Sequence, residues 1–295
     1  MLGQDPTQLT VLNSYMDYHL KGHPYVKSAV DMACWDILGK ATGLPVNTLL
    51  GGNFNTGGIP LYRAIGQASP AKMAAMVGQY VEQGYQRFQL KLGGDPAEDI
   101  ERIKACRERL SLRSQVLIGD SNTGWSTAGA LRVAAAVKDL DVYIEQPCPT
   151  YRECLTVRQH TNLPFVLDEV VDDVQSLLDV YKDGSADVVN VKISKFGGLT
   201  KARQGLELCS KLGISVTVED TWGGDINTAA ILHLAHTVPA KLLLTVTDFN
   251  SYNTRHTGTI AGAVKSEGRM SLPTGPGLGV TPNYDELGQP LFVIE

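Results

Sequence analysis

Short apolar runs alternate with amphipathic segments along most of the chain. From Ile59 onward the pattern predicts eight strands, and a continuous apolar run is typical of a strand buried on both faces of a parallel sheet. The expected strands are 59–65, 87–93, 115–121, 142–147, 164–169, 187–194, 215–220 and 241–247. The expected helices between them are 70–83, 96–111, 126–138, 151–160, 172–182, 198–212 and 225–237.

Eight strands separated by seven helices predict an α/β fold, a (β/α)8 or TIM barrel whose eighth helix is short or replaced. The alternative is an open doubly wound sheet, which would normally carry a glycine-rich phosphate-binding turn after an early strand. The sequence contains neither GxGxxG nor GxxxxGK[ST]. The barrel is therefore the preferred interpretation.

The pattern changes on both sides of this repeat. Residues 1–56 predict helices alone, and the pair His23-Pro24 interrupts them. We expect residues 1–56 to form a helical appendage, residues 57–250 the barrel, and residues 251–295 a tail that folds back over it. The short strand-like pieces of the tail need edge partners, and the chain offers no obvious ones.

An ionisable residue ends each of six successive predicted strands, at intervals of 23 to 29 residues. These residues are Lys91, Asp120, Glu145, Asp168, Lys192 and Asp220. In a parallel barrel the carboxyl ends of all strands lie on one rim, and active sites are built there. Carboxylates flanked by lysines on this rim predict a divalent metal held between two proton-transfer groups.

Asp120, Glu145 and Asp168 are the predicted metal ligands. Mg²⁺ prefers about six oxygen ligands, a few of them from carboxylates. No His or Cys accompanies these residues at ligand spacing, which argues against zinc. The alternative is that these carboxylates cap helices or pair with surface lysines, which is common for one acidic residue but not for three at the same strand position. Asn122 and Glu169 are candidates for orienting the ligands.

Lys91 and Lys192 end strands on opposite sides of the predicted barrel. A partly desolvated lysine near a metal has a depressed pKa and can act as a general base. Two such lysines allow a proton to leave one face of a substrate and return on the other. The alternative is two surface lysines with solvated ammonium groups. Lys195 is a weaker candidate for the role of Lys192.

Composition and charge exclude other classes of protein. A net charge of −5 and a pI of about 5.7 argue against a nucleic-acid binder. The five cysteines are odd in number and form no CxxC motif, as is typical of reduced cytosolic thiols. No apolar run approaches the ~20 residues of a membrane span, and the start lacks a secretory signal pattern. The expectation is a cytoplasmic enzyme without a nucleic-acid or membrane partner.

Five segments, in this order and spacing, resemble the mandelate racemase/muconate lactonising branch of the enolase superfamily. They are QLKLG, IGDSN, IEQPC, LDE and NVKISKFGGLTKA. The segment KSAVDMACWDILGKATGLPV is similar to the helical part that precedes the barrel in that branch. The resemblance implies Mg²⁺ on Asp120, Glu145 and Asp168, Lys91 and Lys192 as acid/base residues, and removal of the proton α to a substrate carboxylate.

Two departures from the family pattern refine this expectation. The usual Lys-x-Lys of the second strand is Gln89-x-Lys91 here, and a neutral Gln can donate a hydrogen bond to a substrate carboxylate without adding charge. With TWGGDI at 221–226, this variant resembles the subgroup that acts on proline-derived amino acids. Relatives also begin with an antiparallel sheet and a mobile loop, so the appendage and tail are expected to form an incomplete α+β capping domain.

The expected substrate is a small proline derivative. Dehydration of cis-3-hydroxy-L-proline, with 2-epimerisation as a second outcome, is the first choice, because Asp248 or Asp220 could pair with its secondary ammonium. The alternative is racemisation or epimerisation of proline betaine or 4-hydroxyproline betaine. An aromatic face holds a quaternary ammonium best, and Trp222, Phe249 and Tyr252 keep that alternative open.

A further alternative belongs to another class, a lidless barrel that binds metal but is catalytically impaired. An open site would leave the lysines hydrated and the substrate poorly oriented. The tail would then be less ordered than the barrel, or would pair with another chain. A homo-oligomer is the expected assembly.

Overall fold

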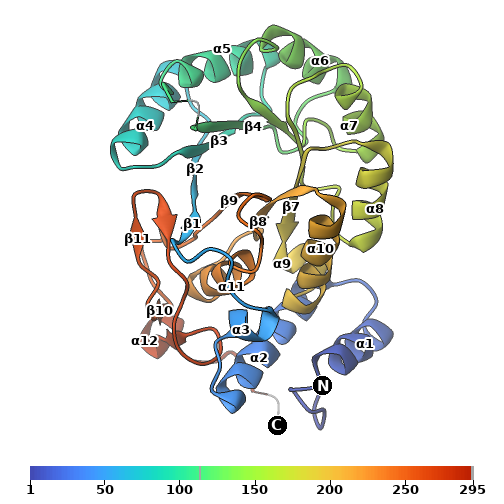
Figure 1. The fold of residues 1–295 in the computed structure, drawn as a ribbon, viewed down its shortest axis with the longest axis vertical. Helices are drawn as coiled ribbons and strands as arrows, with labels where there is room; N and C mark the ends of the chain where they lie inside the picture. The colour runs from blue at the N-terminus through green and yellow to red at the C-terminus, as the bar shows by residue number, and fades with distance from the viewer. Residues whose placement is uncertain (113, 294–295) are drawn as a thin grey trace.

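The computed structural model describes residues 1–112 and 114–293. Eight parallel strands form its central sheet, in the order of the sequence (Figure 1). They are β2 (Tyr62–Ile65), β3 (Arg87–Lys91), β4 (Val116–Asp120), β5 (Tyr143–Glu145), β6 (Phe165–Leu167), β7 (Val188–Lys192), β8 (Ser215–Glu219) and β9 (Leu243–Val246). A parallel bridge between Leu61 and Val246 brings the two edges of the sheet together. The predicted barrel is confirmed, and the open doubly wound sheet is wrong.

Helices lie between successive strands and surround the barrel (Figure 1). They are α4 (Pro70–Glu82), α5 (Pro96–Arg107), α6 (Thr127–Ala136), α7 (Tyr151–Arg158), α8 (Val174–Asp183), α10 (Leu199–Leu212) and α11 (Asp225–Ala235). Each overlaps a helix predicted from the sequence. Side chains of Asp95, Ser126 and Thr150 accept hydrogen bonds from first-turn amides, which fixes where α5, α6 and α7 begin. None of the described helices has the length and apolar content needed to cross a lipid bilayer.

Two details of the barrel differ from the prediction. A four-residue helix, α9 (Ile193–Phe196), follows β7 directly, where the predicted strand continues to residue 194. The first predicted strand is divided, because β1 (Ile59–Pro60) pairs with the tail and only β2 joins the barrel.

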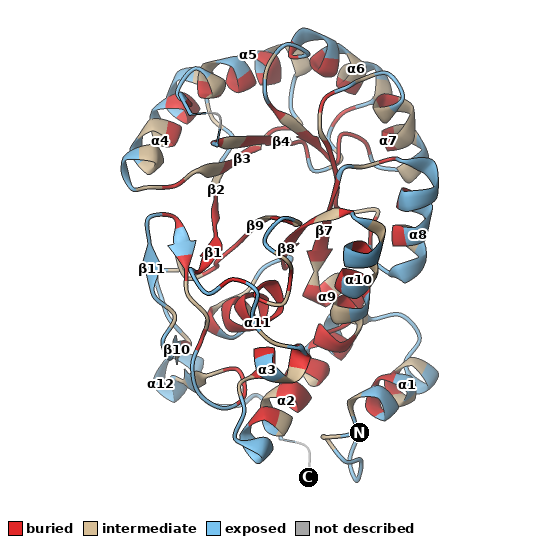
Figure 2. Ribbon diagram, in the orientation of Figure 1, coloured by how far each residue is buried: buried red, intermediate tan, exposed pale blue. Residues whose placement is uncertain are grey.

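Side chains alternate between two environments along each barrel strand. In β3, Phe88 and Leu90 are fully buried in the apolar core, which fills the space between the strands and the helices (Figure 2). Gln89 and Lys91 share the opposite face of the same strand. This alternation explains how apolar strand sequences carry polar side chains into the barrel's interior.

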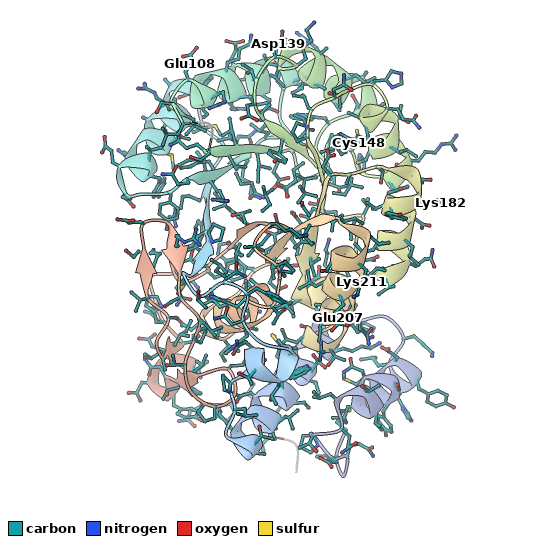
Figure 3. The ribbon with its side chains drawn as sticks, in the orientation of Figure 1. Glu108, Asp139, Cys148, Lys182, Glu207 and Lys211 are labelled. Atoms are coloured by element: carbon teal, nitrogen blue, oxygen red, sulfur yellow. The ribbon has the colours of Figure 1, made fainter. Side chains whose placement is uncertain are left out.

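The outside of the ring of helices is charged. Glu108, Asp139 and Lys182 are exposed on the outer surface of the helices, whereas Cys148 lies inside the ring (Figure 3). All five cysteines are buried and free, which agrees with the expectation of reduced thiols.

The N-terminal helices α1 (Leu9–His19), α2 (Pro24–Thr42) and α3 (Val46–Leu50) pack beside the later helices of the barrel (Figure 1). The buried carboxylate of Asp31 accepts hydrogen bonds from the backbone N–H of Thr200, its hydroxyl, and the amide of Asn13. Gly198 is required beside it, because its φ is +128° and a Cβ there would lie 2.4 Å from Asp31 Oδ2. These contacts attach the appendage to the start of α10.

The C-terminal tail forms strands that pair within the chain. β10 (Gly258–Ile260) pairs with β13 (Val280–Pro282), and β12 (Arg269–Met270) pairs with both β11 (Lys265–Ser266) and β1. A short helix, α12 (Tyr284–Leu287), follows. The expectation that the tail lacks strand partners is therefore wrong. Residues 294–295 of the predicted tail lie outside the described residues, and the domain limits at 56 and 250 stay predictions.

His233 of α11 joins three segments that are distant in sequence. Its Nδ1 accepts a hydrogen bond from the backbone N–H of Asn47 at 3.2 Å, and its Nε2 lies 3.1 Å from the carbonyl oxygen of Leu278. Only a neutral imidazole with its proton on Nε2 makes both bonds. Burial lowers the pKa of His233 from 6.5 to about 4.

We predict that His233 makes the fold sensitive to acid. Between pH 6.5 and about 4 the unfolded chain binds a proton that the folded chain does not, so the unfolding free energy decreases as the pH falls. Relative to His233→Gln, wild-type protein should lose about 2 kcal/mol between pH 7 and pH 5. Urea unfolding of both proteins at the two pH values measures this, and a difference independent of pH would contradict the prediction.

Candidate active site

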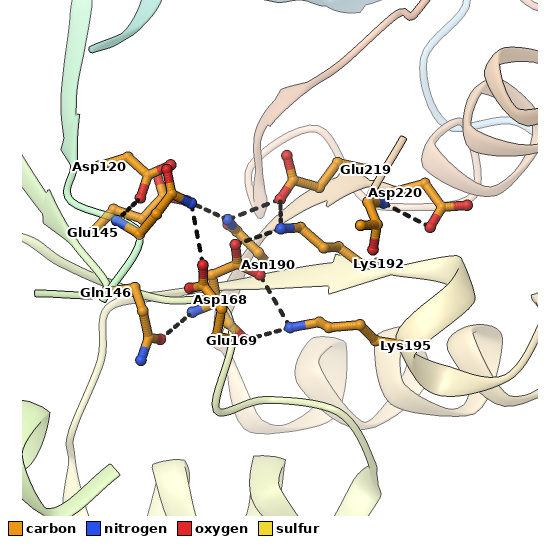
Figure 4. A network of polar contacts seen from close by, with 12 residues as sticks. Asp120, Glu145, Gln146, Asp168, Glu169, Asn190, Lys192, Lys195, Glu219 and Asp220 are labelled. Carbon is orange, nitrogen blue, oxygen red and sulfur yellow. Dashed lines mark hydrogen bonds and ion pairs between the residues drawn. The ribbon is translucent and has the colours of Figure 1, made fainter. Parts of the chain in front are cut away.

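The predicted rim residues lie at the carboxyl ends of successive barrel strands. Lys91, Asp120, Glu145 and Lys192 end β3, β4, β5 and β7, whereas Asp168 and Asp220 directly follow β6 and β8. Lys91 is the register partner of Asp120, which is the partner of Glu145. Their side chains therefore point to the same side of the sheet. Figure 4 shows Lys192 and Lys195 directed toward Asp168.

Glu145, Asp168 and Glu219 form a compact cluster of buried carboxylates. One oxygen of each lies within 4.8 Å of the others. Asp120, the third predicted ligand, is not in this group and accepts a hydrogen bond from Lys91 Nζ at 2.6 Å. Two of the predicted ligands therefore meet directly, and the third lies one strand away from Glu145.

The sequence prediction missed Glu219. The predicted strand ends one residue later, at Asp220. The alternation in Ser-Val-Thr-Val-Glu at 215–219 could have identified it, because the buried Val216 and Val218 face the core and Thr217 and Glu219 face the interior.

The lysines do not neutralise every carboxylate in the site. Lys91 pairs with Asp120, and both Lys192 and Lys195 pair with Asp168. Glu145 forms no ion pair with any described residue. Within the described part of the chain, its side chain accepts hydrogen bonds only from neutral amides, those of Gln89 at 2.9 and 3.1 Å and of Asn190 at 2.6 Å.

This arrangement suits a hard divalent cation. Burial and the nearby charges of Asp120, Glu219 and Asp168 raise the pKa of Glu145 well above its ordinary value. A cation would supply the positive charge that Glu145 lacks, and carboxylate oxygens are the ligands that Mg²⁺ takes. The donor set therefore fits the predicted metal.

The carboxylates that the two lysines contact determine the direction of their pKa shifts. Burial lowers the pKa of Lys91, but the charges of Asp120 and Glu145 outweigh it and raise the pKa to about 12. The pKa of Lys192 is raised as well, because Glu219 and Asp168 outweigh its burial. The depressed pKa that the sequence predicts applies to a lysine beside a bound metal, and it stays a prediction.

The residues expected to orient the ligands lie beside them. The backbone N–H of Asn122 donates to Asp120 Oδ1 at 2.8 Å, and its side-chain amide donates to Glu169 Oε1 at 3.1 Å. Gln146, which the sequence prediction did not include, accepts from the backbone N–H of Asp168 at 2.9 Å. Gln146 thereby connects the end of β5 to the predicted metal ligand that follows β6.

A pocket of about 260 Å³ opens beside the two predicted catalytic lysines. Its lining includes the predicted residues Gln89, Asp220 and Trp222, but not Asp248. Trp222 lies 5.4 Å from Phe249 between ring centroids, and the two form an aromatic wall with Tyr252. A larger, open hollow of about 820 Å³ lies at the amino ends of the strands, away from these lysines.

Comparison with known families decides the assignment. Residues 72–287 match the family described as "Enolase C-terminal domain-like", and residues 1–51 match "Mandelate racemase / muconate lactonizing enzyme, N-terminal domain". The chain belongs to the mandelate racemase/muconate lactonising group of the enolase superfamily. The resemblance noted in the sequence is confirmed.

Members of this superfamily with known activities are similar to nearly the whole chain. A cis-3-hydroxy-L-proline dehydratase of Roseibium aggregatum is 50% identical over 99% of this chain and 78% of that protein. An N-succinyl-L-Arg/Lys racemase of Bacillus cereus is 29% identical over 97% of this chain and 77% of that protein. These homologues in the enolase superfamily are enzymes of the dehydratase and racemase classes.

Solved structures of the superfamily share the fold. A mandelate racemase/muconate lactonising enzyme from Roseovarius nubinhibens is 41% identical, with a TM-score of 0.92 over 98% of this chain and 80% of that one. A second protein from the same organism, solved in complex with magnesium, is 35% identical, with a TM-score of 0.93 over 98% of this chain and 81% of that one. Enolase superfamily members of this shape therefore do bind magnesium.

We predict that Glu145 lowers the unfolding free energy of this protein when EDTA removes divalent metals. Its pKa is raised on folding, so its ionised form opposes folding at neutral pH. In EDTA at pH 7.5, Glu145→Gln should raise Tm by a few degrees, since 1 kcal/mol corresponds to about 2–4 °C in large domains. The exposed pair of Glu101 with Lys104 offers a control, and Glu101→Gln should leave Tm unchanged. A lower Tm for Glu145→Gln in EDTA would contradict the prediction.

Proposed function

We propose that this chain is a Mg²⁺-dependent enzyme that removes the proton α to a carboxylate and dehydrates cis-3-hydroxy-L-proline. The observation that carries the proposal is the placement of Lys91 and Lys192 four strands apart in an eight-stranded barrel, beside one pocket and one carboxylate cluster. The similarity to the Roseibium aggregatum dehydratase supports the choice of substrate.

Asp120, Glu145 and Asp168 are the residues that would hold the Mg²⁺ ion. When bound, Mg²⁺ stabilises the negative charge that develops on the substrate carboxylate as the α-proton leaves. Gln89 and Asn190 hold the Glu145 carboxylate in place, and Gln146 fixes the backbone of Asp168. The protein's contribution is thus a rigid oxygen donor set.

The geometry of the substrate suits lysines on opposite walls. In cis-3-hydroxy-L-proline the hydroxyl and the carboxylate share one face of the ring, so the α-hydrogen and the hydroxyl lie on opposite faces. One lysine accepts the α-proton, and the electron pair of the Cα–H bond is delocalised into the substrate carboxylate. This pair then forms the Cα=Cβ bond as the Cβ–O bond breaks. The other lysine donates a proton to the departing hydroxide, which leaves as water.

The lysine that accepts the α-proton must be neutral when the reaction begins. The charge of Asp120 favours the protonated form of Lys91, and the charges of Glu219 and Asp168 favour the protonated form of Lys192. Positive charge among the same carboxylates would oppose this effect and lower the lysine pKa values. A bound cation would therefore favour the neutral form of the lysine that accepts the α-proton, because it would weaken the ion pairs of Lys91 and Lys192 with the carboxylates.

Epimerisation of a proline betaine is the second candidate function. The aromatic wall of Trp222, Phe249 and Tyr252 favours it, since aromatic faces attract quaternary ammonium groups. Both reactions begin with removal of the α-proton, and they diverge when the intermediate either expels a β-hydroxyl or is reprotonated.

The catalytically impaired barrel, the cytoplasmic location and the homo-oligomer stay predictions.

We expect the protein to convert cis-3-hydroxy-L-proline with Mg²⁺ into a product that has lost one water. Mass spectrometry detects this loss, and ¹H NMR in D₂O detects α-deuteration of L-proline, which lacks the leaving group. EDTA should stop both reactions, and calorimetry should show that Glu145→Gln loses most Mg²⁺ affinity. Absence of both reactions with Mg²⁺ would favour the impaired barrel, and unchanged Mg²⁺ affinity would refute the ligand assignment.

We predict that Lys91→Ala and Lys192→Ala each abolish dehydration, because the reaction needs a base on one face and an acid on the other. The variant that keeps the base should still exchange the α-proton of L-proline in D₂O. Lys182→Ala, which removes an exposed lysine on α8, provides a matched control with normal turnover. Normal turnover of both active-site variants would eliminate the two-lysine mechanism.

A further inference from the structure

Three carboxylates line the pocket beside the lysines, and they differ in their free hydrogen-bonding capacity. They belong to Asp168, Glu219 and Asp220. Asp168 is a predicted metal ligand that pairs with two lysines. Asp220 accepts hydrogen bonds from the backbone N–H groups of Ser194 and Thr221, from the Ser194 hydroxyl and from the Asn227 amide. Its capacity is filled by the protein, which leaves Glu219.

Asp248, the other residue expected to pair with a substrate ammonium, is poorly placed for that role. It is 1% exposed and does not line the pocket. Its Oδ2 accepts a hydrogen bond from the Ser251 hydroxyl. Neither acidic residue singled out in the sequence is therefore suited to bind a ligand in this pocket.

Glu219 is held rigidly with part of its capacity free. The hydroxyl of Tyr62 donates to its Oε2 at 2.7 Å, and the amide of Asn190 donates to its Oε1 at 3.0 Å. Lys192 Nζ lies 3.5 Å from the same Oε1. A carboxylate can accept about four hydrogen bonds, so Glu219 can accept one more from a ligand, on the wall that carries Lys192.

Gln89 adds an independent observation in the same pocket. Both hydrogen bonds from its side-chain Nε2 go to Glu145, so the amide oxygen points away from that carboxylate. This oxygen, Gln89 Oε1, is buried and has no hydrogen-bond partner among the described residues. An unpaired buried acceptor costs free energy, and the side chain, 3% exposed, lines the pocket. An N–H donor from a ligand would satisfy it.

We propose that Glu219 and the Gln89 carbonyl bind the secondary ammonium of a cyclic amino acid. A ring ammonium carries one positive charge and two N–H donors, which match one carboxylate and one unpaired amide oxygen. A betaine has no N–H and would leave Gln89 Oε1 unpaired. This inference rests on the proposed function and deepens it, because it selects free cyclic amino acids over their N,N-dimethylated forms.

Calorimetry with matched ligands tests this site in the Mg²⁺-saturated protein. L-Proline and (S)-tetrahydrofuran-2-carboxylate have the same ring size and carboxylate, but only L-proline carries the ammonium. Wild-type protein should prefer L-proline, and Glu219→Gln should raise its Kd by roughly 10- to 100-fold. The Kd of the oxygen analogue should change by less than about twofold, since its ring oxygen brings no positive charge to residue 219.

Controls separate this effect from a general disturbance of the site. Asp248→Asn removes a buried carboxylate outside the pocket lining and should leave the ratio of the two Kd values unchanged. If Glu219→Gln does not fold, as judged by circular dichroism, Glu219→Asp keeps the charge but withdraws it, and should reduce the preference for L-proline. An equal loss of affinity for both ligands, or a loss of preference in Asp248→Asn alone, would overturn the proposal.

The same experiment distinguishes failure of this site from failure of the proposed reaction. Binding of L-proline that depends on Glu219, without dehydration of cis-3-hydroxy-L-proline, would support the ammonium site and overturn the reaction. Tighter binding of proline betaine than of L-proline would overturn the ammonium site and favour epimerisation. Wild-type protein that binds neither L-proline nor its oxygen analogue would overturn both.

Discussion

The unneutralised carboxylate of Glu145, at the carboxyl end of β5, is the constraint on which the site depends. A buried carboxylate with no cationic partner is unfavourable unless hydrogen bonds or a cation compensate it. Among the described residues, only the amides of Gln89 and Asn190 donate hydrogen bonds to this side chain. The lysines pair with neighbouring carboxylates instead. The folded protein is thus prepared for a divalent cation at a cost in its own stability.

The barrel tolerates this destabilising arrangement because it separates an apolar layer from a polar layer. Apolar residues such as Phe88 and Ile144 face the helices and form the core, whereas alternate positions carry polar groups inward. The core stabilises the fold independently of the site, at roughly 1.5–3 kcal/mol for each large apolar side chain fully buried. The appendage and tail add to it through Asp31 and His233. Polar groups can then be concentrated at one end without loss of the fold.

The pocket divides its chemistry between its walls. Lys91, Asp120 and Glu145 belong to β3, β4 and β5, whereas Lys192 and Glu219 belong to β7 and β8. A proline-type substrate needs its carboxylate near a metal, its α-carbon between two lysines and its ammonium near an acid. Glu219 would meet the last need, and through Asn190 it shares a hydrogen-bond network with Glu145. Recognition of the substrate and retention of the metal are therefore connected in one buried network.

The sequence alone determined the eight strands and the rim positions of Lys91 and Glu145, because strand burial and side-chain alternation are local properties and parallel strands end on one rim. Only the tertiary structure decided that Glu219 rather than Asp220 is free to meet a ligand, that the Gln89 amide binds Glu145, and that the tail pairs with β1. It also placed Lys91 against the Asp120 carboxylate, which raises the pKa of the lysine. Each of these outcomes depends on which side chains from distant segments come within hydrogen-bonding distance, and no local pattern specifies that.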